Sequence, residues 1–243
     1  MNGTLWIRTL GIRAIWMGTL GLLAVFALAA CEDAPKRVTL QGQTMGTYWR
    51  VTYLAEDGAP APEALESRLE AALVAVNASM STWDPQATIS QFNKSEALTP
   101  FAIEPAFATV VAAAQTVSTA SGGAFDVTVG PLIDLWGFGA GGERRLAPPS
   151  AEAIAAAQAR VGYEKLMVRA EPPSLQRTAP GVEVDLSALA KGYGVDVLAA
   201  VLGTAAPGYY LVDIGGEVRA PGLPDRGLPW RLGLEVTYPP ARG

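Results

Sequence analysis

Asp185, Ser187 and Lys191 are the side chains of this sequence whose types and spacing best suit binding chemistry. Serine often caps the start of a helix, and a helix start presents backbone N–H groups that attract anions, phosphates above all. Asp185 just before that start and Lys191 just after it add a carboxylate and a cation to the same place. The combination suits a polyphosphate bound with a metal ion. The same pattern also fits an ordinary helix start with a solvated lysine. These residues alone therefore do not distinguish a ligand site from a structural helix start.

The elements around these residues are predicted to be a strand followed by a helix. Residues 182–186 alternate between apolar and acidic side chains, which is the period of a strand with one buried face. Apolar residues then recur at helical spacing through Leu189, Val195, Leu198 and Leu202, and Gly203 has the position of a glycine that ends a helix. We therefore expect a strand that delivers Asp185 to the first turn of a helix capped by Ser187.

Two other stretches contain residues that could contact a flat ligand. Met45 stands beside Gly46 at a break between two strand-like segments, where it either lies over a ligand or occupies the core at a hairpin bend. Trp83 stands beside Pro85 in a polar turn, where its ring is either presented for stacking or belongs to a small cluster under a loop. The residues alone leave both alternatives open.

The remaining pattern mixes strands and helices. The literal G-x-G-x-x-G at 137–142 is rejected as a dinucleotide fingerprint, because charged and proline-rich residues follow it where a helix is required, and we expect a flexible loop. The diglycine at 215–216 interrupts a predicted strand and indicates a close approach to the backbone. The expected elements are strand segments within 38–53 broken near 42–46, a helix opened by Pro60 and Pro62, a helix at 105–120, an extended piece at 124–131, a helix at 150–161, a strand at 165–169, a proline-broken loop at 171–181, and strands at 209–219 and 230–236.

The amino-acid composition excludes several classes of catalytic and metal site. The 243 residues carry a net charge of −5, and half of them are hydrophobic, which suits one domain of fair size or two small ones and disfavours nucleic acid as a partner. They include no histidine and a single cysteine, Cys31. Ser-His-Asp and Cys-His catalysis, His/Cys zinc sites and internal disulfides are therefore excluded within these residues. A metal ion would need oxygen ligands, which favours magnesium or calcium.

The first 30 residues are predicted to be a lipoprotein signal peptide. Arg8 and Arg13 precede an uncharged run at 14–30, which ends in small residues before Cys31. This resembles a bacterial lipobox, in which Cys31 carries the lipid. The competing interpretation is an uncleaved transmembrane helix, although the run is shorter than the roughly 20 residues that normally span a bilayer. We expect a lipidated cysteine and linker at 31–37, a domain at 38–243, and attachment to the outer face of a membrane.

Five motifs occur in one order along the chain and carry a specific resemblance. They are Met45-Gly46-Thr47, M-S-T-W at 80–83, G-A-F-D-V-T-V-G-P-L at 123–132, D-L-S-A-L-A-K-G-Y at 185–193, and Ile214-Gly215-Gly216. Together they resemble the ApbE family of FAD:protein FMN transferases and span nearly all of residues 38–235. The resemblance implies an α+β fold of the T-fold type, with a mostly antiparallel sheet and flanking helices. It also fits a lipid-anchored protein on the periplasmic side of a bacterial cell membrane.

The resemblance also implies a reaction and a site. The family moves the FMN part of FAD to a threonine hydroxyl of an acceptor flavoprotein of the envelope and releases AMP, in a Mg²⁺-dependent reaction. The implied magnesium ligand is the backbone carbonyl of Ala188. The implied contacts to FAD are Met45, Trp83, Ala124, Phe125, Asp126, Asp185 and Lys191.

One part of the family pattern is missing from these 243 residues. Members continue beyond the Gly-Gly strand with a Ser-rich segment, an Asp-Pro-x-Thr-Gly turn and a late Asp/Thr pair that binds magnesium. None of these occurs here, so we expect an incomplete domain with a weak metal site. Two further functions fit the same residues: an envelope lipoprotein that binds FAD without transferring it, and a Mg²⁺-dependent hydrolase that splits FAD into FMN and AMP.

Overall fold

A four-stranded sheet forms one part of the structure. The computed structural model describes residues 36–55, 58–140, 147–205, 208–222 and 229–233, and the residues from Arg37 onward cluster as one compact unit. The sheet has the order β1-β2-β6-β7, and β2 pairs antiparallel with β6, which pairs antiparallel with β7. Its strands are β1 (Lys36–Thr44), β2 (Thr47–Ala55), β6 (Tyr210–Ile214) and β7 (Glu217–Arg219).

Two tight turns join these strands in pairs. Met45 and Gly46 connect β1 to β2, and Gly215 and Gly216 connect β6 to β7. All four residues have positive φ (49°, 71°, 56° and 100°), as two-residue hairpin turns of type I′ require. The break predicted near 42–46 is therefore confirmed as a hairpin turn. The prediction of one strand interrupted by a diglycine is wrong, because the glycines reverse the chain between two strands.

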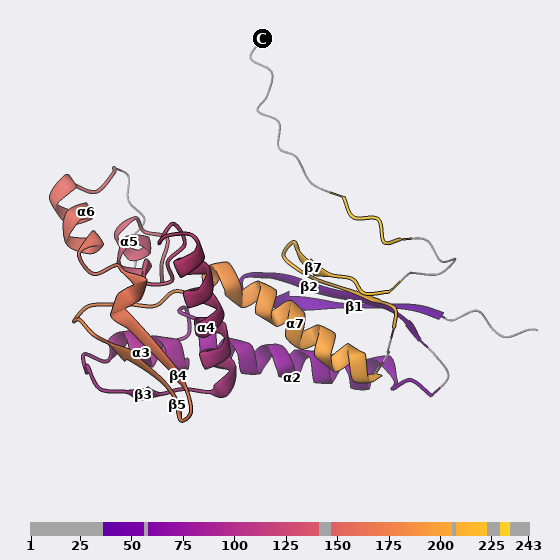
Figure 1. Ribbon diagram of the computed structural model, residues 1–243. Coiled ribbons are helices and arrows are strands. Elements are labelled where there is room, and N and C mark those ends of the chain that lie inside the picture. The colour runs from indigo at the N-terminus through magenta and orange to yellow at the C-terminus, as the bar shows by residue number, and fades with distance from the viewer. Residues whose placement is uncertain (1–35, 56–57, 141–146, 206–207, 223–228, 234–243) are drawn as a thin grey trace, which may run out of the picture. The chain divides into compact units, whose positions relative to one another are not determined.

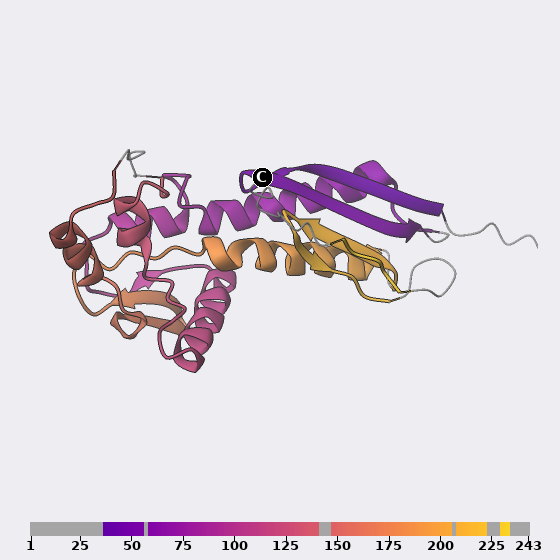
Figure 2. The same ribbon diagram turned by 90° about the horizontal axis from the view of Figure 1, so that it is seen from above.

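Helices α2 (Pro62–Met80) and α7 (Ser187–Ala205) run side by side and pack with the sheet (Figures 1 and 2). The apolar stripe of α2, which consists of Leu65, Leu69, Leu73 and Val76, is buried. By length and composition α7 could also span a membrane, but its buried face belongs to the protein core. The resulting sheet core consists of Leu40, Trp49, Val51, Tyr53, Leu65, Leu69, Leu73, Val195, Leu198, Ala199, Leu202, Ala205, Tyr210, Val212 and Ile214.

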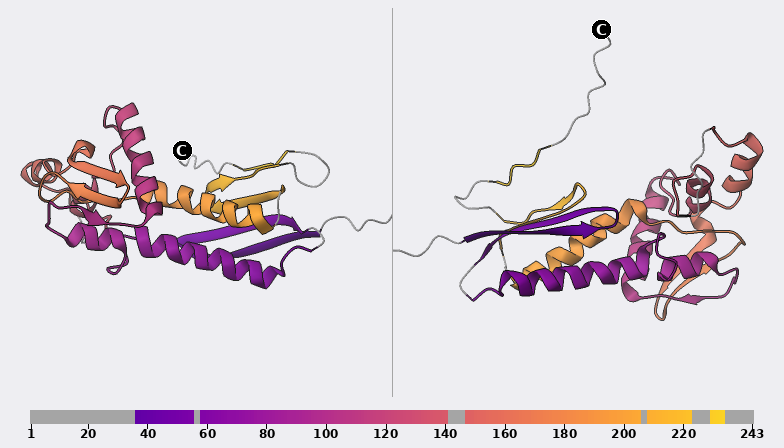
Figure 3. Two further views of the ribbon diagram at one scale, coloured as in Figure 1. Left: turned by 60° about the horizontal axis from the view of Figure 1, so that its bottom comes forward. Right: turned by 180° about the vertical axis from the view of Figure 1, so that it is seen from behind.

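A second core lies under shorter elements. Strands β3 (Phe101–Ala102), β4 (Leu166–Ala170) and β5 (Pro173–Arg177) form an antiparallel sheet of order β3-β5-β4, with α3 (Thr88–Lys94) and α4 (Pro105–Ala120) nearby. Helix α4 contacts both this sheet and α7 (Figure 3). The second core consists of Val76, Met80, Ala87, Ile89, Phe92, Phe107, Val110, Val111, Ala114, Val127, Leu166, Leu175, Val184 and Leu186.

The sequence-based prediction fails in several segments near this second core. The segment 171–181 contains strand β5 and is not a loop; Pro173 is tolerated because it is the first residue of that strand. The segment 124–131 is a series of turns that ends in the short helix α5 (Gly130–Leu135) and is not extended. The helix expected at 150–161 is shorter, since α6 covers Ala151–Gln158 and a 3₁₀ turn follows at Tyr163–Lys165.

Two remaining predictions concern glycine-rich and C-terminal segments. A helix, α5, precedes residue 137 and turns follow it, so the described part of the G-x-G-x-x-G run lacks the strand that a dinucleotide fingerprint requires. Residues 229–233 form no strand, which contradicts the start of the strand expected at 230–236; its other residues lie outside the described ranges. The fold class is confirmed as α+β, with antiparallel sheets and flanking helices.

Candidate functional site

The start of α7 is capped by Asp185. The Asp185 Oδ1 atom accepts a hydrogen bond from the Ser187 backbone N–H at 2.8 Å, and the N–H groups of Leu189 and Ala190 both donate to the Leu186 carbonyl. Ser187 is therefore the first residue of the helix, and the prediction that it is the cap is wrong. Gly203 also departs from its prediction, because it lies inside the last turn of α7. The Asp185 carboxylate thus binds the start of α7 itself, where it was expected to form part of a ligand site.

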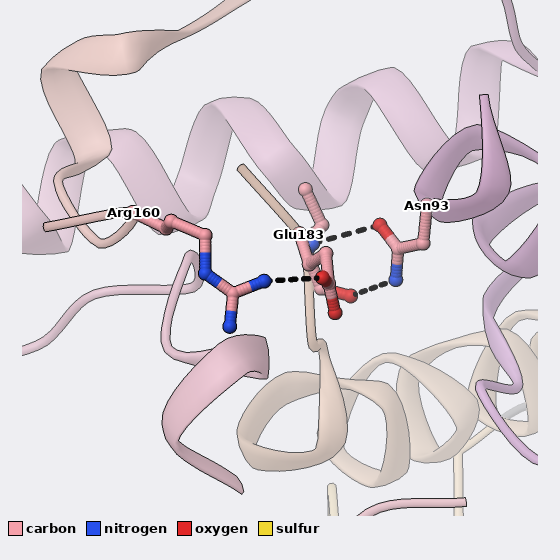
Figure 4. Close-up of polar contacts among 4 residues, drawn as sticks. Asn93, Arg160 and Glu183 are labelled. Atoms are coloured by element: carbon pink, nitrogen blue, oxygen red, sulfur yellow. Dashed lines mark hydrogen bonds and ion pairs between the residues drawn. The ribbon is translucent and has the colours of Figure 1, made fainter. Parts of the chain in front are cut away.

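The segment that delivers Asp185 is extended but belongs to neither sheet. Its backbone pairs with an amide side chain: the Val184 N–H donates to Asn93 Oδ1 and the Val184 carbonyl accepts from Asn93 Nδ2, both at 2.8 Å (Figure 4). The Asp185 N–H donates to the Val127 carbonyl at 2.8 Å. The prediction of a sheet strand at 182–186 is wrong for this reason. The alternation is nevertheless real, since Val182, Val184 and Leu186 are fully buried.

Glu183 lies on the opposite side of this segment from its buried residues. Arg160 Nη1 lies 3.2 Å from Glu183 Oε1, and Figure 4 shows the guanidinium reaching the carboxylate from the side away from Asn93. Burial raises the pKa of Glu183, while the positive charge of Arg160 lowers it and Asp134 raises it further. Ionising Glu183 therefore costs more free energy than ionising an exposed glutamate does.

Glu183 lines a polar pocket of about 300 Å³ at the entry to α7. Three acidic residues line it, Asp134, Glu183 and Asp185, together with Lys94. Thr82 lines this pocket and also the neighbouring one, so the two adjoin at that residue. Among the described residues, no group of three acidic, histidine or cysteine side chains is arranged to hold a metal ion.

The neighbouring hollow, here called the Trp83 cleft, brings together three of the expected FAD contacts. Met45, Trp83 and Lys191 all line it, with Ser187 and Ala190 of the α7 start. A shallower continuation of about 520 Å³ extends past Met45 and Trp83. Trp83 is 69% exposed, so its ring is presented to the cleft and is not the centre of a buried cluster.

Met45 lies at a hairpin bend and packs against the core, as one of its alternatives predicted, and it also lines the Trp83 cleft. It occupies a hairpin turn, and its side chain packs partly against the sheet core and partly against the second core while lining the Trp83 cleft. A methionine at φ 49° is uncommon and costs about 1 kcal/mol relative to an ordinary conformation. The turn therefore holds the Met45 thioether at the junction of the two cores.

Asp126 and its neighbours are placed differently from this group. Asp126 Oδ1 accepts from the Thr128 N–H and hydroxyl, at 2.7 and 2.6 Å, and Oδ2 accepts from the Tyr163 N–H at 2.8 Å. The carboxylate therefore binds the protein's own backbone and the Thr128 hydroxyl. Ala124 is exposed and Phe125 is half-buried against the second core, and neither lines the Trp83 cleft.

Ala188 lies in the first turn of α7, beside a mostly apolar hollow that Glu217 also lines. Glu217 was missed by sequence reasoning, although its Oε2 atom lies 2.9 Å from Lys191 Nζ. The one available signal was its position directly after the diglycine. Asn93 and Thr82 were also missed, because a lone amide or hydroxyl has no periodic signature.

Comparison with known proteins places this arrangement in a family. The profile of the ApbE family matches residues 45–241. The chain is 40% identical over 228 residues to the FAD:protein FMN transferase of Haemophilus influenzae, covering 92% of this chain and 66% of the relative. It is 38% identical over 214 residues to the protein of the same name from Vibrio cholerae, covering 88% and 63% respectively.

Comparison with solved structures indicates the same family. A variant of the flavin transferase ApbE from Vibrio cholerae superimposes with a TM-score of 0.79 at 38% identity, covering 82% of this chain and 68% of that one. The apo flavinyl transferase ApbE of Pseudomonas stutzeri gives a TM-score of 0.77 at 34% identity, covering 83% and 66%. The chain spans slightly less than two thirds of the length of the curated relatives named above. With the motifs, the profile match and the fold in agreement, the chain belongs to the ApbE family.

Proposed function

We propose that this chain carries the flavin-binding part of an enzyme that transfers FMN from FAD to a threonine hydroxyl of an acceptor flavoprotein. The observation that carries the proposal is the meeting of Met45, Trp83 and Lys191 in one cleft beside the start of α7, in a member of the ApbE family. The relatives named above are FAD:protein FMN transferases.

The cleft offers a surface for two parts of FAD, the isoalloxazine ring and the diphosphate. The exposed Trp83 ring and the polarizable Met45 thioether suit the two sides of a flat isoalloxazine. Lys191 supplies a cation for the diphosphate, and a hydrogen bond from a charged group contributes about 1.5–3 kcal/mol. Asp185 lines the adjoining polar pocket, which Thr82 connects to the cleft.

The proposed step exchanges one phosphorus–oxygen bond for another. The acceptor hydroxyl oxygen forms a bond to the phosphorus nearer the flavin, the bond from that phosphorus to the bridging oxygen breaks, and AMP leaves with the electron pair. The hydroxyl proton is released in the same exchange. We assign no residue of this chain as the base, because the described part of the cleft contains no histidine and its one titratable side chain is the cation of Lys191.

Magnesium dependence is part of the proposal, and its support is the family resemblance. The described residues do not by themselves form a magnesium site, since no group of three of their acidic side chains is arranged to hold a metal ion. The Ala188 carbonyl is one candidate oxygen ligand, whereas Mg²⁺ demands six. We therefore derive no step through the metal. Removal of Mg²⁺ by EDTA should abolish transfer if the proposal is right.

Membrane attachment through Cys31 is a further proposal. Its support is the charged and then apolar leader that ends in Leu28-Ala29-Ala30-Cys31. It would place an acidic protein on the periplasmic side of the cell membrane. Labelling with a palmitate analogue should mark the wild-type chain and not Cys31→Ser, and equal labelling of the two would contradict the anchor.

The decisive test supplies the chain with FAD, Mg²⁺ and an acceptor flavoprotein domain. We expect covalent flavin fluorescence on the acceptor and one AMP per flavin transferred. Lys191→Ala should weaken FAD binding by about 10- to 100-fold, the equivalent of one charged hydrogen bond, whereas Lys191→Arg should retain most of it.

Other outcomes separate the alternatives. Free FMN and AMP without acceptor would indicate a hydrolase, and tight FAD binding without AMP would indicate a binding protein. A wild-type chain that does not bind FAD would refute all three.

A further inference from the structure

The ammonium of Lys191 is held from outside the Trp83 cleft. Glu217 Oε2 lies 2.9 Å from Lys191 Nζ, and Glu217 lines the apolar hollow beyond the cleft. That oxygen is shielded from solvent and forms no hydrogen bond within the described residues. Its charge is balanced there by the ion pair with Lys191. A pairing of this kind fixes a side chain whose four-carbon stem is otherwise flexible.

Glu217 is placed by the diglycine hairpin. It is the first residue of β7 and pairs with Ile214 across the turn. The Gly215 N–H donates to the Tyr48 carbonyl at 3.1 Å, and the Gly216 N–H donates to Asp213 Oδ1 at 2.9 Å. A Cβ atom on Gly215 would lie 2.8 Å from Thr47, so the two hairpin turns touch. Glu217 is thus tied to the turn that presents Met45.

Helix α7 approaches the same turns through Gly194. A Cβ atom there would lie 3.1 Å from Ile214 Cδ1 and 3.3 Å from Met45 Cε. The strand that carries Glu217, the turn that carries Met45 and the helix that carries Lys191 therefore form one packed unit. This packing fixes where the side chains of Met45 and Lys191 leave the backbone, and the pairing with Glu217 restricts the remaining freedom of the lysine stem.

We propose that Glu217 is a positioning residue, which holds the Lys191 ammonium where the FAD diphosphate binds. The inference rests on the proposed function. Because the lysine is ordered before the ligand arrives, the entropy of ordering its stem is not lost on binding. Glu217 itself acts through Lys191 and does not contact the ligand. Its loss should weaken FAD binding by about fivefold, the range expected for one immobilised side chain.

The same helix and strand provide a matched control. Arg219 Nη1 lies 2.7 Å from Asp196 Oδ1, so a second ion pair joins β7 to α7 with the charges exchanged. Neither residue lines the Trp83 cleft. Asp196→Asn removes one β7–α7 ion pair as Glu217→Gln does, but leaves Lys191 paired. General loosening of β7 would therefore affect both variants, whereas positioning of Lys191 would affect Glu217→Gln alone.

The experiment measures the dissociation constants of FAD and of riboflavin, which lacks phosphate, on the full chain in detergent. Glu217→Gln should weaken FAD binding about fivefold and leave riboflavin unchanged. Glu217→Asp should recover part of the loss, Asp196→Asn should change neither constant, and Glu217→Gln should add nothing to Lys191→Ala. Unchanged or tighter FAD binding by Glu217→Gln, or an equal loss in Asp196→Asn, would overturn the inference.

A ligand-free measurement keeps the inference separate from the proposed function. The rate at which an N-hydroxysuccinimide ester acylates Lys191, read by peptide mass spectrometry against exposed Lys36, should rise several-fold in Glu217→Gln. An unchanged rate would show that Glu217 does not hold the lysine. A wild-type chain that binds neither flavin would refute the proposed function and the ligand part of this inference, while the acylation rate would still decide the placement of Lys191.

Discussion

The two cores of this protein differ in how far side chains take part in their hydrogen bonding. The sheet core rests on backbone ladders, in which β2 pairs with β6 from Trp49 to Tyr53 and β6 pairs with β7. Around the second core, the backbone ladder of β3, β5 and β4 is supplemented by side chains that bond to backbone groups. Asn93 pairs with Val184, the Asp126 carboxylate collects the N–H groups of Thr128 and Tyr163, and the Gln115 amide donates to the carbonyls of Tyr163 and Leu166.

The difference shows where the candidate site comes from. Met45 packs against both cores, and α7 contributes Val195 and Leu198 to the sheet core while Leu189 and Tyr193 pack against the second core. The Trp83 cleft therefore lies where the sheet core meets a region in which side chains supply several of the hydrogen bonds to the backbone. Residues from both regions must keep their relative positions for the cleft to persist.

The largest predicted effect tests whether the two cores unfold together. Trp49→Ala in the sheet core and Phe107→Ala in the second core should each destabilise the protein by about 3–5 kcal/mol, because each removes a fully buried ring. Since Met45 and α7 belong to both cores, we expect one shared transition in denaturant, followed by fluorescence and circular dichroism. Val74→Ala, on the exposed face of α2, is the control and should change stability by less than about 0.5 kcal/mol. Two separate transitions would show that the cores are independent.

A smaller effect tests the hydrogen bonds between an amide side chain and the backbone around the second core. Asn93→Ala leaves the N–H and carbonyl of Val184 without their partner and should cost about 1–3 kcal/mol. Asn77→Ala is the matched control: its amide makes one 3.2 Å hydrogen bond to Thr44 Oγ1, so its removal should cost about 1 kcal/mol or less. Chemical denaturation measures both. Equal losses would mean that the Asn93 amide does not act as a substitute strand.

The junction of the cores is tested by adding a methyl group. Gly194→Ala requires the ends of Ile214 and Met45 to move by a few tenths of an ångström, but it also improves helix propensity by about 1 kcal/mol. We expect stability within about 1 kcal/mol of wild type and weaker FAD binding, because Met45 is displaced. Gly203→Ala meets no atom within 4 Å and should stabilise α7 without changing FAD binding. An unaltered FAD affinity in Gly194→Ala would argue that Met45 does not contact the flavin.

The smallest predicted effect is the pH dependence of Glu183. Because burial raises its folded-state pKa, the protonated carboxyl stabilises the fold below the unfolded pKa, and this contribution is lost as pH rises through the folded pKa. The melting temperature of the wild type relative to Glu183→Gln should therefore be higher at about pH 4 than at about pH 7. The opposite slope would mean that the Arg160 ion pair outweighs desolvation.

The amino-acid sequence determined much of the sheet core and predicted several of the residues that line the Trp83 cleft. Period-2 and helical patterns predicted the β1–β2 hairpin, α2, α4 and the apolar face of α7, because buried faces of regular elements repeat at fixed intervals. The five motifs predicted the family, and with it Met45, Trp83 and Lys191, which the structure brings together in one cleft.

Only the tertiary structure decided what the irregular segments do. The alternation at 182–186 correctly predicted a buried face, but the partner of the Val184 backbone is the side chain of Asn93, 91 residues away, and no local pattern encodes that. The roles of Asp126 as a structural acceptor and of Glu217 as the partner of Lys191 depend likewise on contacts between distant segments. Periodicity reports burial, whereas the identity of a hydrogen-bond partner depends on where the folded chain brings its side chains.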